Sequence, residues 1–132
     1  TVFRESDVVS LHLRLSEQSR GLVTQGHLAL MKPTAYLINT ARGPLVDEAA
    51  LVAALRERRI AGAALDVYDV EPLPPDHPLL GLENAVLTPH LGYVTEEAYQ
   101  VFFSQAVENI ESYLDEQLPP RVLNPEALMR RR

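Results

Sequence analysis

The chain contains short, almost continuous apolar runs, separated by longer stretches in which apolar positions recur every three or four residues. The short runs are VVSLHL at 8–13, AYLINT at 35–40, GAALDV at 62–67 and AVLT at 85–88. Apolar runs of this length, bounded by turn residues, are typical of buried strands. We therefore predict four strands.

Helix-capping residues stand before the segments with helical periodicity. A threonine or aspartate side chain at such a position accepts a hydrogen bond from a backbone N–H in the first turn. We predict helices over residues 25–31, 48–58 and 96–117, capped by Thr24, Asp47 and Thr95.

The order strand, helix, strand, helix, strand, loop, strand, helix predicts an α/β fold with a parallel sheet and right-handed crossovers. The apolar character of the strands indicates that helices cover both faces of the sheet. Four strands are few for a doubly wound sheet, so we expect part of one. We assign residues 1–104 to this domain, and residues 105–132 to a C-terminal helix and tail that pack on a domain outside the chain.

Composition narrows the classes of function. The 132 residues are 46% apolar and 23% charged, which favours a packed core over disorder. The net charge of −6 argues against nucleic acid or an anionic membrane as a partner. Cysteine is absent, which suits a cytoplasmic protein, and no apolar run reaches the roughly 20 residues of a membrane span.

Four chemically capable side chains follow the predicted strands. Arg42 follows the second strand, Asp66 and then Glu71 follow the third, and His90 follows the fourth. Open α/β sheets bind ligands outside the carboxyl ends of their strands, so these residues are expected at one edge.

These side chains suit acid–base chemistry on a carboxylic acid. The planar guanidinium of Arg42 can bind a carboxylate through two hydrogen bonds. A histidine oriented by a carboxylate, here His90 by Glu71, can donate a proton to a carbonyl or take one from a hydroxyl. The four histidines are scattered and no HExxH motif occurs, so we expect no metal site.

Each of these residues also has a structural interpretation. Arg42 could be a surface arginine paired with Asp47 or Glu48, and His90 could be a structural histidine. Glu71 could be solvated, and Asp66 could accept hydrogen bonds from backbone amides in a turn.

Four segments resemble, in order, the signature blocks of the D-isomer-specific 2-hydroxy acid dehydrogenases. They are SDVVSLHL at 6–13, LMKPTAYLINTARGPLVDEAALVAAL at 30–55, GAALDVYDVEP at 62–72 and LTPHLGYVTEEA at 87–98. The resemblance runs from about Ser6 to Pro125 and implies a Rossmann-like fold.

The resemblance implies NAD-linked oxidation of a small 2-hydroxy acid or reduction of a 2-keto acid, with NADP not excluded, by a homodimer. It assigns the substrate carboxylate to Arg42, the general acid and base to His90, and support of that histidine to Glu71. The residues that it places near the cofactor are Leu13, Thr40, Ala41, Arg42, Asp66, His90, Leu91, Gly92 and Tyr93.

The chain also departs from the family. Arg14 stands where the family usually has proline, which either changes the turn beside the cofactor or is a tolerated surface change. No GxGxxG motif occurs, although a dinucleotide pyrophosphate needs such a turn. We therefore expect a fragment, with negligible activity and weak NAD affinity alone.

Two other functions are compatible with the same residues. The fold also serves in an NAD-sensing transcriptional corepressor, in which binding of a partner matters more than turnover. The second alternative is a non-catalytic truncated product, which would be stable only as an oligomer formed through its exposed sheet edge.

Overall fold

The computed structural model describes residues 2–126, which form two compact units, residues 2–92 and 93–126. The first unit holds the sheet and its helices, and the second holds one long helix and the segment after it.

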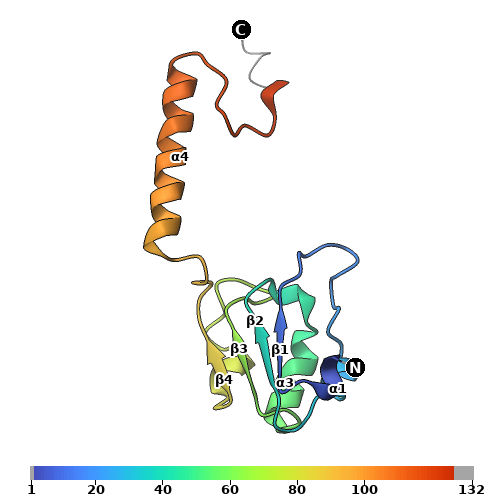
Figure 1. Cartoon of the computed structure of the whole chain (residues 1–132). Helices are drawn as coiled ribbons and strands as arrows, with labels where there is room; N and C mark the ends of the chain where they lie inside the picture. The colour runs from blue at the N-terminus through green and yellow to red at the C-terminus, as the bar shows by residue number, and fades with distance from the viewer. Residues whose placement is uncertain (1, 127–132) are drawn as a thin grey trace. The chain divides into compact units, whose positions relative to one another are not determined.

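The first unit is built on one parallel sheet with the strand order β1-β2-β3-β4 (Figure 1). The strands are β1 (Val8–Leu11), β2 (Tyr36–Asn39), β3 (Gly62–Leu65) and β4 (Ala85–Leu87). The predicted α/β fold and all four strands are confirmed. Each strand ends one or two residues before the predicted end, because the residues that follow leave the ladder to form turns.

Short helices connect the strands. They are α1 (Val2–Glu5), α2 (Gln25–Leu28) and α3 (Glu48–Arg56), with 3₁₀ turns η1 (Gly43–Leu45) and η2 (Pro78–Gly81). The predicted caps are confirmed, since the side chains of Thr24 and Asp47 accept from the backbone N–H groups of His27 and Ala50. Both helices end earlier than predicted, α2 at Leu28 and α3 at Arg56.

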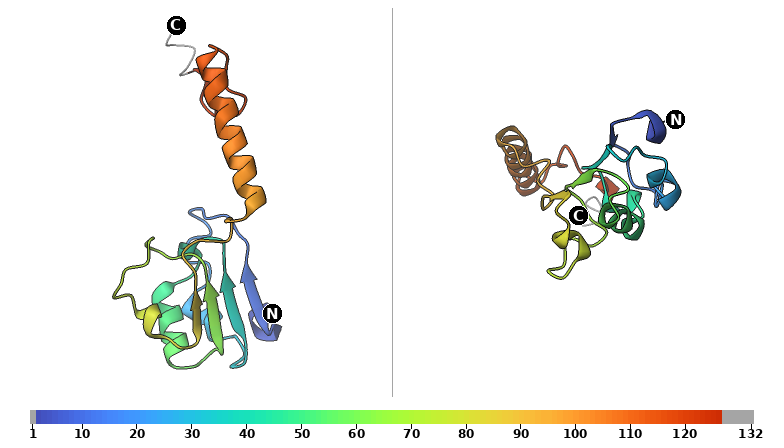
Figure 2. Two further views of the ribbon diagram at one scale, coloured as in Figure 1. Left: turned by 90° about the vertical axis from the view of Figure 1, so that its left-hand side faces the viewer. Right: turned by 90° about the horizontal axis from the view of Figure 1, so that it is seen from below.

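One face of the sheet carries the core. Alternate strand residues, among them Leu11, Leu37 and Leu65, are buried in one cluster with Leu51 and Leu55 of α3. Figure 2 shows α3 lying against this face. Each leucine side chain removed from water contributes roughly 1.5–3 kcal/mol, so this layer fixes the positions of the strand ends.

The other face of the sheet is open among residues 2–92, where the sequence predicted cover on both sides. Val8, Tyr36 and Val86 point to this face and are 53%, 51% and 66% exposed. The strands therefore have the apolar composition of a sheet covered on both faces, although alternate strand residues are exposed here.

A carboxylate on α3 holds the loop that follows β3. Glu48 Oε1 lies 2.9 Å from His77 Nε2, and Glu48 Oε2 accepts from the N–H of Asp69 at 3.3 Å. His77 Nδ1 accepts from the N–H of Leu79, so its hydrogen is on Nε2 and is donated to Glu48. The loop after β3 is thereby tied to the first turn of α3.

Gly43 brings two strand-end loops into backbone contact. A Cβ atom at this position would lie 2.0 Å from the carbonyl carbon of Tyr68 and 2.6 Å from the nitrogen of Asp69. Only glycine allows the loop after β2 to approach the loop after β3 so closely. Arg42 and the segment that leads to Glu71 are neighbours for this reason.

The second unit contains α4 (Glu96–Leu114), which is capped by the side chain of Thr95 as predicted. None of its residues is buried, and its exposed apolar residues include Val101, Phe102, Phe103, Val107 and Ile110. Arg121 pairs with Glu108 at 2.6 Å, which ties the segment after α4 to the helix. No helix within residues 2–126 is long and apolar enough to cross a membrane.

Replacing Gly43 with alanine is expected to destabilise the chain by more than about 3 kcal/mol, because the new methyl group overlaps the Tyr68–Asp69 backbone. Urea unfolding followed by circular dichroism measures the change. Gly81→Ala is the matched control, since a Cβ there has nothing within 4 Å. Equal stabilities of the two variants would contradict the close approach.

Candidate functional site

The predicted site residues follow the ends of neighbouring parallel strands. In the sheet register, Asn39 pairs with Leu65 and Leu65 pairs with Leu87. The turns that begin at Thr40, Asp66 and Thr88 therefore start at the same level of one edge. This edge is where open parallel sheets bind their ligands.

The last residue of β2, Asn39, organises the turn that carries Arg42. Its side chain is 1% exposed. Nδ2 donates to the carbonyl of Arg42 at 2.9 Å, and Oδ1 accepts from the N–H of Ala41 at 3.1 Å. Both ends of the buried amide are satisfied, so the backbone of residues 40–42 is held in one conformation.

Arg42 is exposed and has an extended backbone, with φ −153°. Its Nη1 donates to the carbonyl of Ala41 at 2.6 Å. Among residues 2–126 it forms no ion pair, so the alternative pairing with Asp47 or Glu48 does not occur. Its charge acts instead on Glu71, whose pKa it helps to lower.

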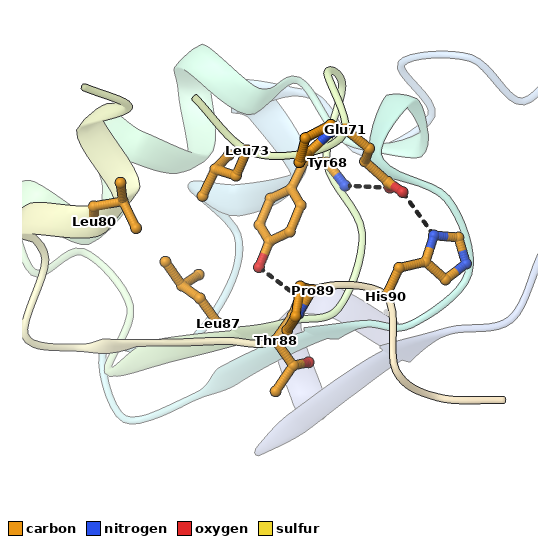
Figure 3. A pocket seen from close by; sticks show the side chains of 9 residues that line it. Tyr68, Glu71, Leu73, Leu80, Leu87, Thr88, Pro89 and His90 are labelled. Atoms are coloured by element: carbon orange, nitrogen blue, oxygen red, sulfur yellow. Dashed lines mark hydrogen bonds and ion pairs between the residues drawn. The ribbon is translucent and has the colours of Figure 1, made fainter. Parts of the chain in front are cut away.

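Glu71 connects the loop after β3 to the histidine after β4. Its Oε1 accepts from the N–H of Tyr68 at 3.0 Å, and its Oε2 lies 2.7 Å from Nδ1 of His90. Figure 3 shows the glutamate side chain directed at the imidazole ring. The glutamate is therefore a fixed partner of His90 and is not merely solvated.

The charge state of Glu71 decides which nitrogen of His90 carries a proton. Burial raises the pKa of Glu71, but hydrogen bonds from His90 and Tyr68 and the charges of His90 and Arg42 outweigh it and lower the pKa. An ionised carboxylate only accepts, so Nδ1 of His90 donates to it. Nε2 is then the ring nitrogen that can exchange a proton with a ligand.

Tyr68 packs between the ends of β3 and β4. It is 5% exposed, and its hydroxyl lies 3.1 Å from the carbonyl of Leu65 and 2.9 Å from that of Thr88. Burial raises the pKa of Tyr68, and the nearby charge of Asp66 raises it further, so the hydroxyl stays protonated and donates. Its ring and its hydroxyl hold the two strand ends together.

Asp66 fixes the turn that contains His90. The carboxylate is 5% exposed and accepts from the hydroxyl of Thr88 and from the N–H groups of Leu91 and Gly92, both at 2.8 Å. Burial opposes ionisation, but these three hydrogen bonds and the charge of His90 lower the pKa of Asp66. The turn interpretation of Asp66 is thus confirmed.

The turn holds His90 in an uncommon conformation. The φ angle of His90 is 57°, in the left-handed region that costs an L-residue roughly 1–2 kcal/mol. The hydrogen bonds from the turn to Asp66 offset this cost. The conformation is therefore over-determined by its surroundings, as is common for functional residues.

Two pockets open at this edge. One, of about 460 Å³, lies over β4 and is lined mainly by apolar side chains such as Leu73, Leu80 and Leu87, with Glu71 and His90 also lining it (Figure 3). The other, of about 430 Å³, lies between the ends of β1 and β2 and is lined by residues 12–15 and 40–42.

The structure brings most of the predicted site residues into these groups. Glu71 and His90 are in contact, Leu13, Thr40, Ala41 and Arg42 line the pocket between β1 and β2, and Asp66 binds Leu91 and Gly92. Tyr93 belongs to the second unit, where its ring centre lies 6.3 Å from that of Phe102.

Sequence reasoning missed three residues that position the site: Asn39, Gly43 and Tyr68. The sequence did carry a signal for Asn39, because this polar residue ends an apolar strand and a buried amide needs hydrogen-bond partners nearby. The contacts of Gly43 and Tyr68 join segments that are distant in sequence, and no local signal marks them.

The sequence matches the model of a known family over residues 1–92, described as the NAD-binding domain of D-isomer-specific 2-hydroxyacid dehydrogenases. The chain belongs to the D-isomer-specific 2-hydroxyacid dehydrogenases. It is 49% identical, over 128 residues, to a glyoxylate reductase from Thermofilum pendens. The matched segment covers 97% of this chain and 38% of the relative. The predicted family is confirmed.

Solved structures of similar proteins share the fold. A putative D-3-phosphoglycerate dehydrogenase from Ralstonia solanacearum has a TM-score of 0.89 at 44% identity, over 96% of this chain and 36% of that one. A D-lactate dehydrogenase from Lactobacillus jensenii, solved with NAD⁺, has a TM-score of 0.77 at 30% identity, over 92% and 41%. The chain thus spans about two fifths of the length of its relatives.

Asp66→Asn is expected to destabilise the chain by about 2 kcal/mol at neutral pH. The carboxylate accepts hydrogen bonds from three donors through two oxygens, whereas the carboxamide has only one oxygen to accept them. The folded-state pKa of Asp66 is lowered, so the stabilisation is present above the ordinary aspartate pKa of about 4 and lost as pH falls below it. Urea unfolding at neutral and acid pH tests both points.

The matched control for this experiment is Asp76→Asn, in which an exposed aspartate is neutralised. We expect its stability to follow that of the original chain at both pH values. A destabilisation by Asp66→Asn that stayed the same from neutral to acid pH would contradict an ionised, hydrogen-bonded carboxylate.

Proposed function

We propose that this chain is the catalytic half of an NAD-dependent dehydrogenase that interconverts a small D-2-hydroxy acid and its 2-keto acid in the cytoplasm. The observation that carries the proposal is the 2.7 Å contact of His90 with Glu71, on the same sheet edge as Arg42. The family match supports it, and the names of several relatives make glyoxylate the first substrate to test.

Arg42 binds the substrate carboxylate in this proposal. Its turn is fixed by Asn39, and no carboxylate among residues 2–126 forms an ion pair with it. A guanidinium held in this way can form two parallel hydrogen bonds with a carboxylate and also polarise the adjacent carbonyl. The substrate's C2 would thereby be oriented toward the histidine.

His90 transfers the proton. Its Nε2 gives a proton to the carbonyl oxygen during reduction and takes one from the hydroxyl during oxidation. Glu71 stabilises the protonated ring and keeps Nδ1 as a donor, because its own lowered pKa leaves it ionised. The left-handed turn at His90 and the backbone anchor of Glu71 keep the imidazole ring and the carboxylate aligned.

The residues present suit the nicotinamide half of a dinucleotide. The pocket of about 430 Å³ between β1 and β2 is lined by Leu13, Thr40 and Ala41, and the peptide groups of Leu91 and Gly92 are fixed beside Asp66. A bound cofactor would supply or accept the hydride at C2 of the substrate. NADP is not excluded, because a similar structure at 41% identity and TM-score 0.75, over 92% of this chain and 38% of that one, is an imino acid reductase with NADPH.

A further segment completes the site in this proposal. A GxGxxG turn, absent from these 132 residues, would bind the pyrophosphate. The segment from residue 105 onward would pack on the substrate domain, since the apolar residues of α4 are exposed in the second unit. We also propose a homodimer, as most soluble oligomers are symmetric dimers.

In a protein completed by an N-terminal half with such a turn, His90→Gln is expected to lower kcat for glyoxylate reduction by about 10²–10⁴-fold, the contribution of a general acid. Glu71→Gln is expected to lower it less, because His90 remains. The KM for glyoxylate should change little in both. Steady-state rates of NADH consumption measure these effects.

His77→Gln is the matched control, since it removes a second histidine–glutamate pair, of 2.9 Å, whose two residues line neither of the two pockets. We expect its kcat to stay near that of the original protein, with folding checked by circular dichroism. The 132-residue chain alone should show negligible turnover. A kcat in the His90→Gln variant equal to that of the original protein would overturn the proposed role of His90.

A further inference from the structure

The pocket between β1 and β2 is rich in positive charge. Its lining, residues 12–15 and 40–42, includes Arg14, Arg42 and His12, and contains no carboxylate. The polar and apolar groups at its surface are mixed, and it lies at the carboxyl edge of the sheet. A pocket with this lining favours an anionic ligand.

The two arginines have no carboxylate partner within residues 2–126. Some other basic side chains there do have one, such as Lys32, which lies 2.8 Å from Asp7, and Arg59, which lies 2.8 Å from Glu57. Neither Arg14 nor Arg42 forms such a pair, although the chain carries more acidic than basic residues. Two guanidinium groups that have no carboxylate partner among residues 2–126 and line one pocket are available to an anionic ligand.

One small acid cannot occupy both arginines and reach His90. Arg42 precedes Gly43, which touches the Tyr68–Asp69 backbone of the loop that carries Glu71, so Arg42 lies on the side of the histidine. Arg14 follows β1, three strands away from β4, which precedes His90. With strands about 4.8 Å apart, this places the two strand ends roughly 14 Å from one another. A ligand that contacts both ends must be extended, and an anionic group on it would suit the arginine beside β1.

We infer that Arg14 binds a phosphate group of the dinucleotide cofactor, while Arg42 is left for the substrate carboxylate. The inference rests on the proposed function, which supplies an extended ligand with phosphates. Arginine is suited to phosphate because its planar donors match two oxygens at once. Arg14 would then add cofactor affinity from a position outside any glycine-rich turn.

The test is a titration of the ¹⁵N-labelled 132-residue chain with inorganic pyrophosphate, with NADH and with oxalate, an analogue of the keto acid. We expect amide shifts in residues 12–15 with pyrophosphate and NADH, and in residues 40–42 with oxalate. Arg14→Gln should weaken pyrophosphate and NADH binding about three- to fivefold, as expected for one solvent-accessible ion pair, and leave oxalate binding unchanged. Higher salt should weaken pyrophosphate binding to the original chain more than pyrophosphate binding to the Arg14→Gln variant.

Arg56→Gln, which removes an exposed arginine at the end of α3, is the matched control and should titrate like the original chain. Equal pyrophosphate affinity in Arg14→Gln and the original chain would overturn the inference. So would an absence of shifts in residues 12–15, or a loss of oxalate binding in Arg14→Gln. None of these results would affect the proposed function, which is judged separately by turnover of the completed protein.

Discussion

The candidate site depends on one buried carboxylate, that of Asp66. Burial alone would favour its neutral form, but three donors from the turn after β4 keep it ionised. Since its two oxygens bind the N–H groups of different residues, the turn has a single geometry. That geometry holds His90 at a positive φ and turns its ring toward Glu71.

Much of the fold could be predicted because it is encoded locally. Thr24, Asp47 and Thr95 cap their helices through side chains that reach only three residues ahead. The edge that gathers Arg42, Glu71 and His90 followed from parallel strand order. The exact strand ends could not be predicted, because apolar residues continue into turns whose hydrogen bonds come from other strands.

The parts of the site that escaped prediction are contacts between distant segments. Gly43 is special only because Tyr68 and Asp69 approach it, and Tyr68 is special only because Thr88 lies opposite its hydroxyl. The prediction that both faces of the sheet are covered failed for a similar reason. Its strands are apolar enough for two covered faces, yet residues 2–92 supply helices to one. Single-residue patterns do not carry this information.

The anchor of Glu71 is a main-chain N–H, that of Tyr68, and not a side chain. Every amino acid except proline has this group, so acid–base chemistry alone places almost no demand on the identity of residue 68. The aromatic ring is required by packing between β3 and β4 instead. Tyr68 also lines the pocket beside His90, so a change of its ring would alter that pocket while leaving the main-chain anchor of the glutamate in place.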